Sequence, residues 1–356
     1  MRGSDHQQED MFTYGSLDQR ISSDHPLRRI RDLADRALRP LAGKLEDLYA
    51  DTGRPSIAPE RLLRAMLLQV LYSIRSERAL MDQIDLHLGF RWFVGLSAND
   101  DVWDASTFSK NRERLLGGDV AREFLESTLA EARRRQWLSD DRFTVDGTLI
   151  EAWASAASYQ PKSDPPAPGA GSGRRGELQK RDLYESKTDP EARLYKKSAA
   201  EKSKLCYLGH LLSDMRQGLV AAAQVTVASA RAEREAAAEM IENLAWRKRR
   251  ILVVADKAYD EAEFVERLRG LTATPQLTQY TGQRRSAIDR RTTRHPSYAV
   301  NQHCRKQIER IFGWLKQVGG QRRTRFRGVE RVGWMFTFSA AVYNLVRMAN
   351  LSRATA

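Results

Sequence analysis

Cysteine is nearly absent from this sequence. The chain of 356 residues has two cysteines, Cys206 and Cys304, and no Cys-x-x-Cys pair. This scarcity argues against a disulfide scaffold and a structural zinc site, and it fits a reducing compartment. We expect neither His210, in a strand near Cys206, nor His303, beside Cys304, to bind zinc or act in catalysis. His210 could still line the edge of a site.

Long apolar runs are also missing. The longest apolar-leaning run, Gly333–Val346, is too short to span a membrane and is interrupted by Thr337 and Ser339. It predicts a packed helix. The first residues, Met1–Tyr14, are polar and lack the apolar stretch of a signal peptide. We therefore expect a cytoplasmic protein with no membrane partner.

Acidic residues are the minority charge. The chain has 46 Asp and Glu against 59 Lys and Arg, which gives a formal net charge of +13. That excess favours a polyanionic partner, nucleic acid rather than a membrane surface, although a merely basic enzyme is the alternative. Thirteen of the basic residues lie between Arg284 and Arg327. Such a run is usually a solvated face, but it also suits contacts with a DNA backbone.

The first part of the chain reads as helical. A chain of this length usually forms two domains, and residues 26–135 carry apolar residues at helical spacing. Pro59 suits the first turn of one helix. Further helices are expected near 78–88, 106–116 and 119–136. These helices form either an ordinary bundle or a DNA-binding module, and the pattern alone leaves both open.

One of these expected helices is rich in cations. Lys110, Arg112 and Arg114 lie on it, and either Asp104 or Ser106 could cap its first turn. A cationic helix of this kind is suited to contacts with DNA phosphates, but it is equally a solvated face.

From residue 140 onwards, short apolar runs alternate with helical ones. Strands are expected at 142–145, 205–214, 219–227, 251–255 and 274–278, and helices at 230–246, 260–270 and 299–318. The second and third strands read as a hairpin with its turn near 216–218. Residues 161–176 are rich in Pro, Gly and Ser, which predicts a flexible insert at about 160–177.

This order of elements is that of the ribonuclease-H-like fold. We predict an α/β domain over 138–350 with a mixed five-stranded sheet and helices, preceded by an all-helical domain over 1–137. In that fold the first and fourth strands are neighbours. Asp146 and Asp256, which end these two strands, would then meet at one edge, where open α/β sheets place their sites.

A third carboxylate lies in the last expected helix. With about 100° of rotation per residue, Gln302, Arg305, Glu309 and Lys316 fall on one polar stripe. The apolar sector beside it would pack on the sheet, so the stripe would lie at the border of the core. The alternative is an ordinary solvated face with an Arg305–Glu309 ion pair.

Together, Asp146, Asp256 and Glu309 predict a metal site. Singly, Asp146-Gly147 could be a hairpin turn and Asp256 a helix cap. Gathered in one place, three carboxylates would repel one another unless a cation lay between them. Oxygen-only ligands favour Mg²⁺ or Mn²⁺, and two such ions roughly 3.5–4 Å apart support phosphoryl transfer.

Other side chains near these strands are weaker candidates. The alternative carboxylates are Asp140, Asp141, Glu151 and Asp260. We prefer Asp146 and Asp256 because each immediately follows the last apolar residue of its strand. Trp153 and Trp314 could stack on a flipped base, but packing in the core is the simpler expectation.

These motifs resemble those of DDE transposases of bacterial insertion sequences, in the insertion-sequence-five group. The family's third-acid signature is Tyr, two residues, Arg, three residues, Glu, six residues, Lys. Three of its four positions match here, and the tyrosine position is Gln302. VDGT at 145–148 and VADKAYD at 254–260 resemble the first and second acid motifs. Residues 53–78 and 104–115 resemble the N-terminal domain of the same transposases.

The resemblance implies an enzyme that binds the terminal inverted repeats of its own element, cuts at the ends and joins them to target DNA. Asp146, Asp256 and Glu309 would hold two Mg²⁺ ions, for which Mn²⁺ substitutes. Arg305 and Lys316 would hold phosphates near the scissile bond. The remaining expected DNA contacts are Arg322, Arg323, Arg325, Lys110 and Arg112. The helical domain would recognise the ends and supply dimer contacts, in the bacterial cytoplasm at the nucleoid.

Two other interpretations compete with an active transposase. One is a catalytically silent DNA-binding regulator derived from a transposase. The other is a ribonuclease-H-like nuclease that hydrolyses DNA and never joins it. Inverted repeats beside the gene would favour the transposase, and joined products would distinguish it from a nuclease.

Overall fold

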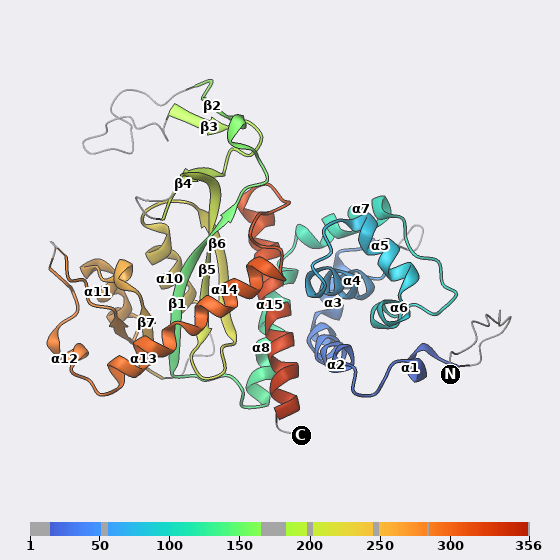
Figure 1. Cartoon of the computed structure of the whole chain (residues 1–356), viewed down its shortest axis with the longest axis horizontal. Helices are drawn as coiled ribbons and strands as arrows, with labels where there is room; N and C mark the ends of the chain where they lie inside the picture. Colours follow the sequence, from blue (N-terminus) through green and yellow to red (C-terminus); the bar gives the residue numbers. More distant parts are fainter. Residues whose placement is uncertain are drawn as a thin grey trace, which may run out of the picture.

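The computed structural model places a group of helices beside a mixed β-sheet, with one long helix between them (Figure 1). It describes residues 15–50, 56–164, 183–197, 202–244, 249–282 and 285–354. The helices come from the first part of the chain and the sheet from the second, as the sequence predicts.

The first part of the chain is helical, as its apolar spacing predicts. Its helices are α1 Leu17–Arg20, α2 Pro26–Leu38, α3 Ala42–Asp47, α4 Pro59–Leu71, α5 Glu77–Leu86, α6 Leu88–Val94, α7 Ala105–Leu116 and α8 Val120–Arg134. Pro59 opens α4, where a missing N–H costs nothing. Asp104 is the cap of α7, because its carboxylate accepts a hydrogen bond from the Ser106 N–H at 2.7 Å.

The main sheet has the ribonuclease-H-like strand order. Its strands are β1 Arg142–Glu151, β4 Arg193–Tyr195, β5 Lys204–Asp214, β6 Val220–Val227, β7 Ile251–Ala255 and β8 Ala273–Leu277. They lie in the order β6-β5-β1-β7-β8, with β4 paired to the beginning of β5. β1, β7 and β8 are parallel, and β5 runs antiparallel to β1 and β6. The predicted fold and the predicted hairpin of β5 and β6 are thus confirmed.

The first strand is longer than the sequence predicts. β1 continues through Asp146 and Gly147 to Glu151 instead of ending at Val145. The reason is its partner, because β5 pairs with β1 without interruption from Phe143 to Glu151. Asp146-Gly147 is therefore no hairpin turn, and the ladder of β5 overrides the local turn signal of the dipeptide.

The expected helix at 299–318 is two helices. α13 Ser297–Arg305 and α14 Gln307–Gln317 are separated by a turn at Lys306. The two are anchored to different partners. Asn301 of α13 donates to the Gln276 side chain of β8 at 2.8 Å, whereas Ile308 and Ile311 of α14 are buried in the core against the sheet.

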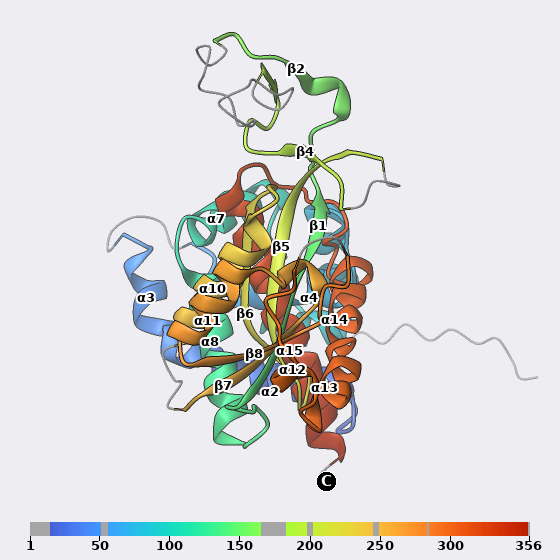
Figure 2. The ribbon, with the colours of Figure 1, turned by 90° about the vertical axis from the view of Figure 1, so that its left-hand side faces the viewer.

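Helices cover both faces of the sheet (Figure 2). α10 Ala232–Glu242 and α11 Ala262–Gly270 share one hydrophobic core with β1, β7 and β8. α14 and α15 Val329–Ala354 share another core with β1, β5 and β6 on the opposite face. The short helix α12 Arg290–Thr293 precedes α13. The expected helices near 230–246 and 260–270 correspond to α10 and α11.

α15 joins the two parts of the molecule. Its residues Phe338, Leu345 and Met348 belong to the core of the N-terminal helices, and Phe336 belongs to the core beneath the sheet. Asn344 also fixes the first residue of β6, because its side chain accepts from the Val220 N–H at 2.8 Å and donates to the Val220 carbonyl at 2.9 Å. The predicted packed helix at 333–346 is the middle of α15.

Two predictions concern the borders of these parts. The proposed division at 137/138 falls between α8 and β1 and stays a prediction, because α15 packs on both sides of it. The predicted insert at about 160–177 lies mostly outside the described residues. Its first residues belong to β2 Tyr159–Pro161, which pairs with β3 Tyr184–Ser186 in a small separate sheet.

Within the described ranges, no helix combines the length and the apolar character needed to cross a lipid bilayer.

Candidate active site

Two aspartates are placed side by side on neighbouring parallel strands, Asp146 in the middle of β1 and Asp256 directly after the end of β7. The β1–β7 pairing runs from Arg142↔Leu252 to Thr144↔Val254, so the same register continued by two residues sets Asp146 beside Asp256. Burial raises the pKa of Asp146 to about 6; the positive charge of Lys197 lowers it, and the negative charge of Asp256 raises it. This register agrees with the predicted meeting of Asp146 and Asp256, but Asp146 does not end its strand, because β1 continues to Glu151.

The pleat of the strands turns both aspartates towards α14. Phe143 and Val145 pack in the core under α10 and α11. Since side chains alternate along a strand, Asp146 lies on the other face, together with Ile150, which packs with Ile308 of α14. Asp256 follows Ala255, whose side chain also belongs to the α10–α11 core.

Asp256 has the second role that its position suggested. It is the cap of a 3-10 turn at Lys257–Tyr259, where its carboxylate accepts a hydrogen bond from the Ala258 N–H at 2.8 Å. The cap uses one carboxylate oxygen in the direction of the turn. Capping fixes the side chain at the strand end and so supports its place beside Asp146.

A lysine and a glutamate complete this group of charges. The Lys197 ammonium donates a hydrogen bond to the Gly147 carbonyl and lies 3.0 Å from Oε1 of Glu233, in the first turn of α10. Burial alone would lower the pKa of Lys197, but the carboxylates of Glu233 and Asp146 raise it above its ordinary value. Glu233 fits against the strand because residue 147 is glycine, where a Cβ would meet its carboxylate oxygen at 2.8 Å.

A buried tyrosine borders the same group. Tyr259 is 1% exposed, and its hydroxyl has no hydrogen-bond partner among the residues that the structure describes. Burial, and then the negative charges of Glu233 and Asp146, raise its pKa well above the ordinary value. The tyrosine is therefore a neutral hydroxyl at the edge of the acidic group.

Glu309 is not gathered with the two aspartates. It lies exposed in the first turn of α14, and the described part of the chain contains no group of three His, Cys, Asp or Glu side chains arranged to hold a metal ion. α14 nevertheless runs along the correct face. Burial lowers the pKa of Lys316, two turns after Glu309, and the positive charges of Lys197 and Arg322 lower it further. The Glu309 assignment thus stays a prediction.

The residues present fit a divalent cation. Asp146 and Asp256 offer oxygen ligands only, which Mg²⁺ and Mn²⁺ prefer. A positive charge is already held beside them, since the Lys197 ammonium acts on both aspartates and on Glu233. The two aspartates therefore already have a cationic side chain in their neighbourhood.

The other members of the polar stripe have separate partners. Gln302, at the tyrosine position of the motif, accepts a hydrogen bond from the Thr278 hydroxyl at 2.7 Å and donates to the Gln276 carbonyl, and so ties α13 to β8. The Arg305 Nε is buried without a hydrogen-bond partner among the described residues. No Arg305–Glu309 ion pair forms within that part of the chain.

The alternative carboxylates serve the fold. Asp260 is fully buried and accepts hydrogen bonds from the Tyr280 N–H at 2.7 Å and the Ala287 N–H at 2.9 Å, which fixes the loop after β8. Glu151 pairs with Lys204. Asp140 and Asp141 lie before β1, at the end of the strand away from Asp256. None of the four joins the aspartate pair.

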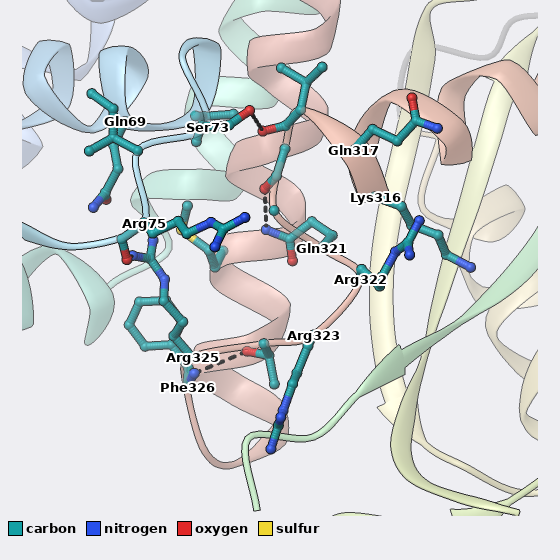
Figure 3. A pocket seen from close by; sticks show the side chains of 17 residues that line it. Gln69, Ser73, Arg75, Lys316, Gln317, Gln321, Arg322, Arg323, Arg325 and Phe326 are labelled. Atoms are coloured by element: carbon teal, nitrogen blue, oxygen red, sulfur yellow. Dashed lines mark hydrogen bonds between the residues drawn. The ribbon is translucent and has the colours of Figure 1, made fainter.

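A cavity of about 680 Å³, which we call the basic cleft, lies at the end of α14 (Figure 3). The cavity lies between the end of α4 and the segment that joins α14 to α15. Its polar lining comprises Gln69, Ser73, Arg75, Lys316, Gln317, Gln321, Arg322, Arg323 and Arg325. Lys316 lines this cleft. Its pKa is also lowered by the charge of Lys197, the lysine that acts on the two aspartates.

The basic segment of the cleft is fixed to the end of β1. The Glu151 N–H donates to the Arg322 carbonyl at 3.0 Å, and the Thr324 N–H donates to the Glu151 carbonyl at 2.8 Å. The Arg323 guanidinium adds a hydrogen bond to the Trp153 carbonyl at 2.9 Å. The strand that carries Asp146 therefore also positions these cations.

Comparison with known families decides the identity. A model described as a transposase DDE domain matches residues 137–345, more than half of the chain, and a model described as a transposase domain (DUF772) matches residues 15–114. The chain belongs to the DDE transposase family. It is an enzyme of phosphodiester cleavage and strand transfer, as the sequence motifs predict. These matches do not assign the chain to a particular group within the family.

Three solved structures are similar to this transposase at low identity. The Mos1 strand transfer complex is 13% identical over 89% of this chain and 84% of that chain, with a TM-score of 0.23. The Mos1 transposase paired-end complex with left transposon end is 12% identical over 86% and 81%, with a TM-score of 0.21. The pre-cleavage Mos1 transpososome is 11% identical over 92% and 98%, also at 0.21. A comparison with curated proteins finds no match.

Two of the predicted DNA contacts lie in the helical part of the transposase. Lys110 is exposed on α7. Arg112 is instead engaged inside the protein, because it pairs with Glu77 and lies 5.2 Å from the ring centroid of Phe326. Both assignments stay predictions, but Arg112 is not offered to solvent, since its side chain is 13% exposed.

Sequence reasoning missed Lys197, Glu233, Gln69 and Arg75. Lys197 and Glu233 reach the aspartates from segments between β4 and β5 and after β6, and no spacing in the sequence links them to Asp146. Gln69 and Arg75 face the basic cleft across the junction of the two parts. The one available signal was Gly147, whose missing side chain makes room for Glu233. Trp153, expected in the core, is 45% exposed, with the Arg327 guanidinium 4.3 Å from its ring centroid.

His210 provides a test of these electrostatics. It lies on β5 opposite Gly147, is fully buried, and shares a hydrogen bond of 2.8 Å with the Thr226 hydroxyl. Burial, assisted by the charge of Lys197, lowers its pKa to about 3. The unfolded chain therefore binds this proton near pH 6.5, well before the folded protein does. The free energy of unfolding is therefore highest above pH 6.5 and decreases as the pH falls below that value, because protonation of His210 favours the unfolded chain.

We predict that His210→Gln removes this loss. Between pH 7.5 and 5, wild type should lose about 2 kcal/mol of unfolding free energy relative to the variant, at about 1.4 kcal/mol per pH unit below 6.5. Urea unfolding at both pH values measures the difference. His303→Gln, at an exposed histidine, is the control and should track wild type. Parallel pH profiles for wild type and His210→Gln would contradict a neutral, buried His210.

Proposed function

We propose that this chain is the transposase of a bacterial insertion sequence of the insertion-sequence-five group. It binds the terminal inverted repeats of its element, cleaves DNA at the element ends and joins those ends to target DNA. The observation that carries the proposal is the strand register that sets Asp146 of β1 beside Asp256 at the end of β7, in a chain that also has a cleft lined with cations.

The carboxylates of Asp146, Asp256 and Glu309 would hold Mg²⁺, for which Mn²⁺ substitutes. When bound, the divalent ions supply the charge that activates the attacking oxygen and stabilises the leaving oxygen. For Glu309 to join the other two, α14 has to bring its first turn towards β1, on the face to which both aspartates point. A bound cation would favour that approach, because it offsets the repulsion of three carboxylates.

Cleavage and joining are two successive displacements at phosphorus. In the first, a water oxygen attacks a phosphodiester at the element end, the bond from phosphorus to the 3′ oxygen breaks, and a 3′-hydroxyl is released. In the second, that hydroxyl attacks a phosphodiester of target DNA, a new bond to phosphorus forms, and a target 3′-hydroxyl leaves. The chain's own part is to hold both phosphates in position next to the aspartates.

The basic cleft is suited to that task. Arg322, Arg323 and Arg325 lie on a segment pinned to the end of β1, so phosphates held there keep a fixed distance from Asp146. Lys316 connects the cleft to the acidic group, and Arg305 has a buried Nε free to donate within the described protein. Contacts of this kind fix the register of the DNA and carry no sequence information. End recognition therefore falls to the helical part, residues 1–137.

Two ends must be brought together before they are joined to a target, and we propose a homodimer for that state, with one protomer at each end. The protein would act on double-stranded DNA in the bacterial cytoplasm, at the nucleoid.

We predict that Asp146→Asn and Asp256→Asn each lower cleavage by more than about a hundredfold, because the charge that binds the ion is lost while the fold is kept. The assay uses a duplex carrying the DNA that flanks the gene, with Mg²⁺ and with EDTA, and scores nicked and joined products. Binding to the same duplex should stay within about threefold of wild type, because the basic cleft is unchanged.

Asp140→Asn is the matched control, since it makes the same change at the opposite end of β1, and it should cleave like wild type. Loss of binding equal to the loss of cleavage would count against the metal assignment. Wild-type binding without any metal-dependent product would favour the regulator, and cleavage without joined products would favour the nuclease.

A further inference from the structure

A lysine ammonium lies next to the segment of β1 that carries Asp146, one of the carboxylates that the proposed function assigns to a metal. Lys197 donates to the Gly147 carbonyl, next to Asp146 in β1, and lies 3.0 Å from Glu233 Oε1. Its charge acts on Asp146 more than any other charged group does, and Asp256 acts on it in turn. The acidic group is therefore balanced by a cation of the chain itself.

The position of this ammonium is built by the fold. α10 presents Glu233 in its first turn, and Gly147 leaves the space in which that carboxylate fits against β1. Glu233 is not needed to hold α10 on the sheet, because the helix is buried there through its alanine, methionine and isoleucine side chains. Its carboxylate instead faces the strand end and holds the ammonium.

The Lys197 side chain has room to move away from Glu233 and Gly147. Its side chain is 35% exposed, whereas that of Glu233 is 18% exposed. Lys197 follows β4, the short strand at the edge of the sheet, and its hydrogen bond to Gly147 is made by a flexible four-carbon side chain. A swing of that side chain into solvent would take the ammonium away from Gly147, and so from the neighbourhood of Asp146, without moving either strand.

We propose that Lys197 is a resident counter-cation of the acidic group, held by Glu233, and that a divalent ion binds by displacing it. This inference rests on the proposed metal site and assigns Lys197 the part of a positioning residue. Without a metal, the ammonium offsets the repulsion between Asp146 and Asp256. On metal binding, one cation replaces another, so Lys197 lowers the affinity for the ion while stabilising the free protein.

The test is Mn²⁺ binding to the full chain at pH 7.5, measured by calorimetry and by the paramagnetic resonance of free Mn²⁺. Lys197→Met removes the charge and keeps most of the side-chain volume. We expect it to bind Mn²⁺ on the order of tenfold more tightly, because no cation has to be displaced. Without metal it should melt at a lower temperature than wild type, and added Mn²⁺ should raise its melting temperature more.

Two variants make this comparison specific. Lys196→Met changes the neighbouring, exposed lysine and should bind Mn²⁺ like wild type. Lys197→Arg keeps a positive charge and should bind no more tightly than wild type. If Lys197→Met does not fold, Lys197→Gln takes its place under the same expectations.

Unchanged or weaker Mn²⁺ binding by the folded Lys197→Met variant would overturn the inference. Weaker DNA binding by that variant, with Mn²⁺ affinity unchanged, would also overturn it and would make Lys197 a phosphate contact. The proposed function fails in a different way. If the metal site itself is wrong, wild type and Asp256→Asn bind Mn²⁺ equally poorly. If only the Lys197 inference is wrong, wild type still binds Mn²⁺ and Asp256→Asn abolishes that binding.

Discussion

The burial of the Asp146 carboxyl beside Asp256 is the constraint on which the proposed site depends. Parallel pairing of β1 with β7 sets Asp146 beside Asp256, and burial makes the charge of Asp146 costly. Positively charged side chains lie in two regions. Lys197, which pairs with Glu233 and bonds to the Gly147 carbonyl, acts on both aspartates, and the cations of the basic cleft, from Lys316 onwards, form a second positive region. A metal ion and a DNA phosphate are the two ligands that we propose for this arrangement.

The basic cleft depends on a second constraint, the packing of α15. This helix contributes to the core of the N-terminal helices and to the core beneath the sheet, so it fixes one part of the chain against the other. The end of α4 and the segment before α15 form the two walls of the cleft as a result. DNA bound there would contact both parts, which joins the part proposed to recognise the ends to the part that carries the chemistry.

Much of this architecture could be predicted from the sequence, because it depends on local patterns. The apolar run at β7, the hairpin of β5 and β6 and the spacing of the N-terminal helices each follow from side-chain periodicity. The aspartate pair follows from the strand order. What could not be predicted depends on contacts between distant segments. β5 extends β1 through Asp146-Gly147, separate anchors divide α13 from α14, and Lys197 meets Glu233 only in the folded chain. The proposed approach of Glu309 belongs to the same class, since it would depend on a cation and on the position of a whole helix.

The most direct test of the account is to map which segments surround the bound ion. Fe²⁺ in place of Mg²⁺, with ascorbate and peroxide, generates hydroxyl radicals that cut the polypeptide next to the metal. With DNA bound, the account predicts cuts beside Asp146, beside Asp256 and in the first turn of α14 at Glu309, all lost in Asp256→Asn. Cuts at the two strand ends with none in α14 would contradict a site shared by these three carboxylates.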